Sequence, residues 1–182
     1  SMDKSPRVTI LHWYQEVDDV ALTLASCLRA LGYTPSIKHY MTDDYGDASF
    51  LFTYAPWGRL QQVTAQLEKR APAERPFWIH WSTEDCPDLR LPKSLVKPVG
   101  RTLAWLDRLR DREDIVGRLA RTAPAHWVHQ RGCKFRYVGM YEYAINQGLM
   151  GLLLEYSQVY ADYYRAMGLP VRYAQWGLID EA

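Results

Sequence analysis

The sequence has few cysteines and no long apolar run. Its three cysteines, Cys27, Cys86 and Cys133, are an odd number without C-x-x-C spacing, which argues for reduced thiols in a cytosolic setting and against a disulfide or zinc framework. No stretch approaches the roughly 18 apolar residues of a membrane helix, and the chain does not open with the charged-then-apolar pattern of a signal peptide. We therefore expect a cytoplasmic protein without a transmembrane segment.

The sequence also lacks the common cofactor and nucleophile motifs. The segment 12-HWYQEVDD-19 follows the first expected strand and contains no glycine, so it cannot make the G-x-G-x-x-G approach to a pyrophosphate. The Walker pattern and the G-x-S-x-G elbow are missing as well. The His and Cys residues of 126-HWVHQRGC-133 match no closed zinc class in their spacing. We predict neither a cofactor nor a metal site.

Composition is that of an ordinary folded protein, but the charge is unevenly distributed. The chain has 182 residues, 48% apolar and 24% charged, which fits one soluble globular domain. Residues 90–136 hold twelve Lys or Arg against four Asp or Glu, although the whole chain has a net charge of only +1. Such a segment can attract phosphates, nucleic acid or an anionic membrane. Because its acidic residues recur at helical pair spacing, we favour an ion-paired surface and expect no nucleic-acid partner.

Strand-like segments alternate with segments of helical periodicity. Strands are predicted at 7–13, 35–41, 49–55, 77–81, 134–140, 151–157 and 169–177, and helices at 18–33, 59–71, 102–121, 141–148 and 158–168. Asp18 or Asp19 and Ser157 are predicted N-caps, and Gly32 and Gly168 are predicted helix stops. Segment 86–100 is broken by three prolines. In helix 102–121 the residues expected to face inward are Leu103, Leu106, Leu109, Val116 and Leu119.

This alternation predicts the fold class. Parallel strands need long crossovers, and here the crossovers are the helices. The continuous apolar run 49-SFLFTYA-55 is typical of a strand buried inside a parallel sheet. We therefore predict an α/β protein, a Rossmann-like three-layer sandwich with a mostly parallel sheet, as a single domain over residues 1–182.

The ends of the predicted strands collect titratable and aromatic residues. Ligands of open parallel sheets bind at the carboxyl ends of the strands, where loops and helix N-termini converge. The residues at these ends are His12, Glu16, Trp57, His80, Glu84, Glu155 and Trp176. We expect these residues to lie along one rim, at the carboxyl edge of the sheet, and to form a site that suits a sugar or a nucleobase. The alternative is that the aromatic side chains close the top of the core.

The order of units resembles the N-terminal domain of GT-B glycosyltransferases. The segment 152-LLLEYSQVYADYYRAMGLPVRYAQWG-177 is similar to the end of that domain, with a strand, a capped helix, a glycine stop and a last strand. The strand end 79-IHWST-83 resembles that of retaining members, and 136-RYVG-139 resembles the spore-maturation CgeB-like branch. The resemblance covers most of the chain.

The resemblance implies roles for individual residues. His80 would face the acceptor or the transferred sugar, with Glu84 and Asp85 orienting it or stabilising charge. A histidine near its ordinary pKa can exchange a proton at neutral pH, and we predict His80 and Glu84 as catalytic. The predicted substrate-binding residues are His12, Glu16, Trp57, Asp85, Glu155 and Trp176. The alternative for His80 is a hydrogen bond to a neighbouring backbone group.

The resemblance also implies partners. GT-B enzymes bind the nucleotide sugar chiefly in a second Rossmann-like domain, and no residues follow Ala182 to build one here. We therefore expect an acceptor-side domain that binds a glycan or nucleotide sugar and is completed by a second domain or subunit. The alternative is a non-enzymatic module that forms homo-oligomers through aromatic side chains. Those side chains would be Tyr14, Tyr54, Trp57, Tyr160 and Tyr164.

Overall fold

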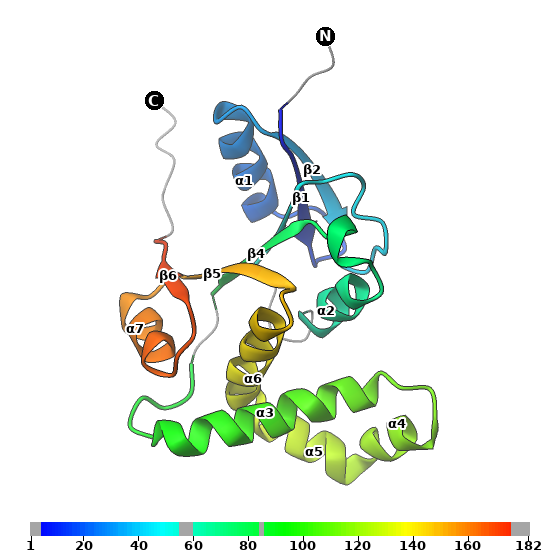
Figure 1. Ribbon diagram of the computed structural model, residues 1–182, viewed down its shortest axis with the longest axis vertical. Coiled ribbons are helices and arrows are strands. Elements are labelled where there is room, and N and C mark those ends of the chain that lie inside the picture. The colour runs from blue at the N-terminus through cyan, green and yellow to red at the C-terminus, as the bar shows by residue number, and fades with distance from the viewer. Residues whose placement is uncertain (1–4, 55–59, 84–85, 176–182) are drawn as a thin grey trace.

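Six parallel strands form one sheet in the order β2-β1-β3-β4-β5-β6 (Figure 1). The structure is a computed structural model that describes residues 5–54, 60–83 and 86–175. The strands are β1 (Arg7–His12), β2 (Thr34–His39), β3 (Phe50–Thr53), β4 (Phe77–Ser82), β5 (Met150–Glu155) and β6 (Val171–Tyr173). Neighbouring strands pair in parallel. This sheet, with helices on its faces, confirms the predicted α/β Rossmann-like three-layer sandwich.

The helices divide between the two faces of the sheet. They are α1 (Asp19–Ala30), α2 (Leu60–Glu68), the short 3-10 helix η2 (Pro72–Glu74), α3 (Lys93–Arg110), α4 (Ile115–Ala120), α5 (Ala123–Arg131), α6 (Cys133–Asn146) and α7 (Gln158–Ala166). Parallel crossovers are right-handed. The step from β1 to β2 therefore puts α1 on one face, and the steps from β3 towards β6 put α2, α6 and α7 on the other.

Local sequence signals set the ends of two of these helices as predicted. The side chain of Asp18 accepts the N–H of Ala21 at 2.8 Å and begins α1. Ser157 accepts the N–H of Tyr160 at 3.4 Å and begins α7. Gly32 and Gly168 follow these helices with φ of +85° and +87°, a backbone conformation that favours glycine. The first and last helical units thus follow their sequence signals closely.

Two hydrophobic clusters hold the layers together. The larger lies between the sheet and helices α2, α6 and α7, and its centre includes Leu51, Trp78 and Leu153, each at most 1% exposed. The smaller packs Ile10 and Phe52 of the sheet against α1. Side chains alternate between the two faces along each strand. The face of any residue at a strand end therefore follows from the residue two positions before it.

Part of the α1 face of the sheet is not covered by a helix in the part of the chain that the structure describes (Figure 1). Phe77 of β4 is 47% exposed there, and its ring lies over Gly151, where a Cβ atom would come within 2.3 Å of it. Beside it, a groove of about 230 Å³ runs between β4 and the end of α1, with Leu31, Phe50 and Ile79 among its apolar walls. The molecule thus presents apolar surface on this side.

A helical insertion separates β4 from β5 and contains most of the differences from the sequence predictions. Segment 134–140, predicted as a strand, is the first half of helix α6. The predicted helix 102–121 is two helices, and α3 begins earlier, at Lys93, with Pro98 inside it. Val116 and Leu119, predicted to face inward, are 37% and 63% exposed on α4.

Helices α3 and α6 of this insertion cross at very close range. A Cβ atom on Gly139 would lie 2.0 Å from the carbonyl oxygen of Gly100, and one on Gly100 would lie 2.4 Å from that of Phe135.

A buried ion pair joins the same two helices, with Arg136 Nε 3.1 Å from the Asp107 carboxylate. His129 of α5 lies 2.5 Å from the same carboxylate. Burial raises the pKa of Asp107 to about 6.

Candidate functional site

The carboxyl edge of the sheet has a topological switch point between β1 and β3. From β1 the chain crosses over one face to β2, and it then returns to β3 on the other side of β1. Neighbouring loops that leave a sheet in opposite directions open a crevice, and ligands of doubly wound sheets bind there. The residues that follow β1 and β3 are therefore the first place to look for a site.

His12 ends β1 at this point and is only 6% exposed. Val8 and Ile10 belong to the α1 cluster, so alternation places His12 on the α1 face. Its ring lies 5.2 Å, centroid to centroid, from that of His39 at the end of β2. Its Nδ1 atom is buried and has no hydrogen-bond partner among the described residues. Such a group costs about 1–3 kcal/mol when left unpaired, so a ligand group that reached it would gain a hydrogen bond.

An aromatic pair follows directly after His12. The rings of Trp13 and Tyr14 lie 4.4 Å apart with 30° between their planes, and Tyr14 is 53% exposed. Glu16 is exposed in the same connection. Asp18 anchors its far end, because the buried Tyr54 hydroxyl donates to both carboxylate oxygens at 2.8 and 2.7 Å. Burial and this contact raise the pKa of Tyr54. The connection between β1 and α1 thus exposes the Tyr14 ring to solvent, and the hydrogen bonds of Asp18 hold its far end in place.

His80 lies inside the protein, and this corrects the expectation that it sits on the rim. It is 1% exposed, and β4 continues beyond it to Ser82. Its Nδ1 atom is 2.7 Å from the hydroxyl of Thr53, which also accepts the indole N–H of Trp78 at 2.8 Å. Burial lowers the pKa of His80 to about 3. The side chain is therefore neutral at pH 7 and does not have the ordinary pKa on which its predicted proton-transfer role was based.

Glu155 ends β5 and is completely buried. Its Oε1 atom accepts the backbone N–H of Ser157 at 3.3 Å, at the start of α7. A carboxylate beside a helix N-terminus is favoured by the helix dipole. Next to it the hydroxyl of Tyr141 donates to Ser82 at 2.9 Å. The surroundings of Glu155 are therefore those of an interior group.

The predicted site residues that the structure describes lie on both faces of the sheet and on the surface. His12 faces α1, whereas His80 and Glu155 face α6 and α7 on the opposite side of the sheet, as Trp78 and Leu153 do. Glu16 is at the same edge but on the surface. The other predicted residues lie outside the described part of the chain; they are Trp57, Glu84, Asp85 and Trp176.

Three residues near this edge are not among the predicted site residues: Trp13, His39 and Thr53. The signal for Trp13 was its position immediately after the strand end, in 12-HWYQE-16. His39 and Thr53 could be found only from strand register, since His12 pairs with His39 and Thr53 pairs with His80 across neighbouring strands.

The aromatic and basic surfaces also differ in part from expectation. Tyr54 and Tyr164, proposed as exposed interface residues, are 5% and 0% exposed because they belong to the two cores. Ion pairs occur within the basic segment, such as Arg112 with Asp114 at 2.5 Å.

Within residues 5–54, 60–83 and 86–175, no three His, Cys, Asp or Glu side chains form a group that could hold a metal ion. No helix in these ranges is long and apolar enough to cross a membrane.

Comparison with known proteins finds no protein family, curated protein or solved structure that matches the chain. The site must therefore be interpreted from its own geometry.

Proposed function

We propose that the chain is the acceptor-side domain of a GT-B-like glycosyltransferase, which binds a sugar at the carboxyl edge of the sheet. The observation that supports this most is the Trp13–Tyr14 aromatic pair, whose rings contact each other at a tilt; it follows β1 at the switch point and leaves Tyr14 53% exposed. The sequence resemblance to GT-B N-terminal domains points to the same edge. A second domain or a partner subunit would supply the nucleotide-sugar site.

The chemistry of this edge suits a carbohydrate. A sugar ring presents C–H groups on its faces and hydroxyls at its rim, so it packs on an aromatic surface and needs acceptors beside it. Tyr14 offers the surface, and the exposed carboxylate of Glu16 offers acceptors in the same connection. The buried Nδ1 atom of His12, which has no partner in the part of the chain that the structure describes, adds a polar contact below this surface.

The interior residues have a supporting role in this proposal. His80 and Thr53 join β4 to β3 just below the edge, through the hydrogen bond between their side chains. We assign His80 no proton transfer, because it is neutral and enclosed. Glu84 stays a predicted catalytic group, and it lies outside the described residues.

Calorimetric titration of acceptor glycans and nucleotide sugars into the protein tests this function. A glycan should bind at the carboxyl edge, and Tyr14→Ala should weaken that binding about fivefold or more, because an aromatic contact contributes about 1 kcal/mol. Trp105→Ala is the matched control, since Trp105 is also 53% exposed but lies on α3 in the insertion. Equal loss in both variants would show that the edge is not the site. Absence of sugar binding, alone and with a donor-binding domain added, would refute the function.

A second candidate function, self-association, is favoured by the uncovered apolar face around Phe77 and the adjoining groove. Apolar surface of this kind commonly marks an interaction site. A second copy of the chain could cover it by a two-fold contact, since the same face would then be buried on both molecules. Light scattering decides this candidate, because a monomer at high micromolar concentration would contradict it.

A further inference from the structure

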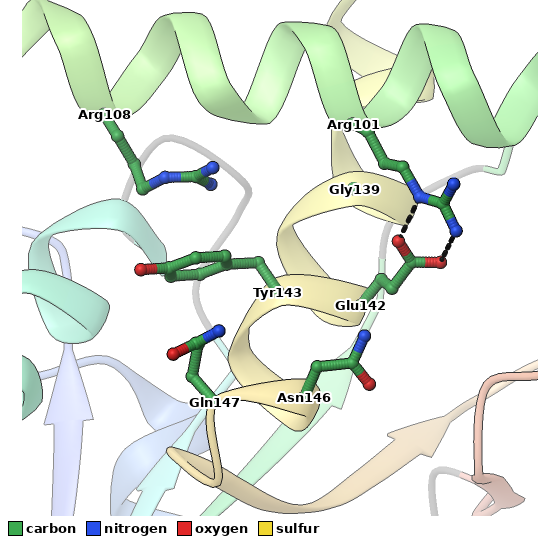
Figure 2. Close-up of a pocket in the computed structure, with 7 residues that line it drawn as sticks. All are labelled: Arg101, Arg108, Gly139, Glu142, Tyr143, Asn146 and Gln147. Atoms are coloured by element: carbon green, nitrogen blue, oxygen red, sulfur yellow. Dashed lines mark hydrogen bonds and ion pairs between the residues drawn. The ribbon is translucent and has the colours of Figure 1, made fainter.

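A polar cavity lies between helices α3 and α6, away from the carboxyl edge. Its volume is about 130 Å³ (Figure 2). Helix α6 ends there and leads into the amino end of β5, so the cavity is at the opposite edge of the sheet from the site described above. The polar side chains that line it are Arg101, Arg108, Glu142, Tyr143, Asn146 and Gln147.

Positive charge exceeds negative charge around this cavity. Arg101 holds Glu142 with two hydrogen bonds of 2.5 and 3.2 Å, and Lys97 Nζ lies 3.7 Å from the same carboxylate. The negative charge of Glu142 is thus paired with two positive charges, those of Arg101 and Lys97. A further carboxylate, that of Glu68, accepts the hydroxyl of Tyr143.

Arg108 has a different environment. Its guanidinium carbon lies 3.8 Å from the centre of the Tyr143 ring, so the group stacks on that ring. Among the described residues no carboxylate forms an ion pair with it. In Figure 2 the guanidinium extends over one side of the Tyr143 ring, and the Gln147 side chain lies on the other side of that ring. Stacking fixes the plane of a guanidinium while its N–H edge stays available to an acceptor.

We propose that this cavity binds a small oxyanion, a carboxylate or a phosphate group, through the guanidinium of Arg108. The planar guanidinium matches two oxygens of such an anion, and charged hydrogen bonds of this kind are among the stronger ones in proteins. The side-chain amides of Asn146 and Gln147 also line the cavity and carry further N–H donors. The volume equals that of about four water molecules in the liquid, which suits an anion of this size and not a whole nucleotide.

The test is a titration of inorganic phosphate and, separately, of acetate into the whole protein at constant pH and ionic strength. Resonances of the Arg108 Nε–Hε group and of the Asn146 and Gln147 side chains are followed by NMR. We expect saturable shifts at these groups with at least one of the two anions. Phosphate alone would identify a phosphoryl group as the ligand, and acetate alone would identify a carboxylate. No saturable shift with either anion would overturn the proposal.

The variant Arg108→Lys sharpens this test, because it keeps the charge and removes the planar two-point contact. Affinity should fall about tenfold or more. Arg118→Lys on the exposed surface of α4 is the control and should keep the wild-type affinity. An equal loss in the two variants, or none in Arg108→Lys, would contradict the site. Both variants are checked for unchanged thermal unfolding, and sugar binding at the carboxyl edge should be unaffected.

Discussion

Replacement of Gly139 by alanine should destabilise the protein, although alanine is normally the better helix residue. The new Cβ atom would lie 2.0 Å from the carbonyl oxygen of Gly100, 2.3 Å from its carbon and 2.8 Å from the backbone nitrogen of Arg101. All three atoms belong to the backbone of α3, so no side-chain rotation relieves the clash. To reach an ordinary contact of 3.4 Å, helices α3 and α6 must separate by about 1.4 Å.

Two opposing terms set the magnitude of this effect. Alanine gains about 1 kcal/mol over glycine inside a helix. Overpacking of a close contact typically costs 1–3 kcal/mol, and the upper end applies because the whole helix must move. The net loss in free energy of unfolding is then about 2 kcal/mol. For a chain of this length, that lowers Tm by about 4–8 °C.

Thermal and denaturant unfolding of the variant measures this loss. Gly148→Ala is the matched control, because Gly148 follows the same helix, has open space within 4 Å and a φ of +69°. Its penalty is left-handed backbone strain of roughly 1–2 kcal/mol, without any contact between the two helices. A Gly139→Ala variant that is as stable as the wild type, or more stable, would show that the two helices do not approach as closely as described.

Two further variants test the buried histidine and the apolar face. Because burial lowers the pKa of His80 to about 3, the unfolded chain binds a proton near pH 6.5 that the folded chain does not. Stability should therefore fall by about 2 kcal/mol from pH 7 to pH 5 through this residue. His80→Gln should lose that part of the pH dependence in urea titrations, and an unchanged slope would contradict the assigned burial. Phe77→Lys should lower the dimer fraction in sedimentation, whereas a wild-type monomer would remove the basis for self-association.

The sheet could be predicted from the sequence because its strands carry strong local signals. The run 49-SFLFTYA-55 is apolar throughout, as expected of a strand covered on both faces, and it contains β3. The strand predicted at 77–81 matches β4, which ends one residue later, at Ser82. The caps Asp18 and Ser157 act through short-range hydrogen bonds, so the signal and the structure lie within three residues of each other.

The second half of helix α6 lies in the predicted helix 141–148, but the first half could not be predicted because it is covered on more than one side. Tyr137, Val138, Met140 and Tyr141 are consecutive or nearly so, and all are buried. A helix between a sheet and another helix has no single apolar stripe, so the 3.6-residue period is lost. Its aromatic and β-branched residues then indicate a strand. Gly100 and Gly139 mark the place where α3 and α6 pack closely, but their role becomes visible only once the two helices are seen in contact.

The sequence predicts which edge of the sheet the candidate site residues occupy, but not which face of the sheet each side chain lies on. His12 and Glu155 do lie at the carboxyl ends of their strands. Their separation onto opposite faces depends on strand register, which the sequence alone leaves open. His80 could be placed in the interior only through Thr53 and Trp78, which are its neighbours across and along the strands.

Helix α5 has a further consequence for the behaviour of the chain. None of its described side chains is buried, and Trp127 and Val128 are 60% and 44% exposed. Unravelling such a helix exposes little new apolar area, so it costs far less than global unfolding. The amide protons of α5 should exchange with solvent well before those of β3 and β4. A protease should make its first cut there while the sheet remains intact.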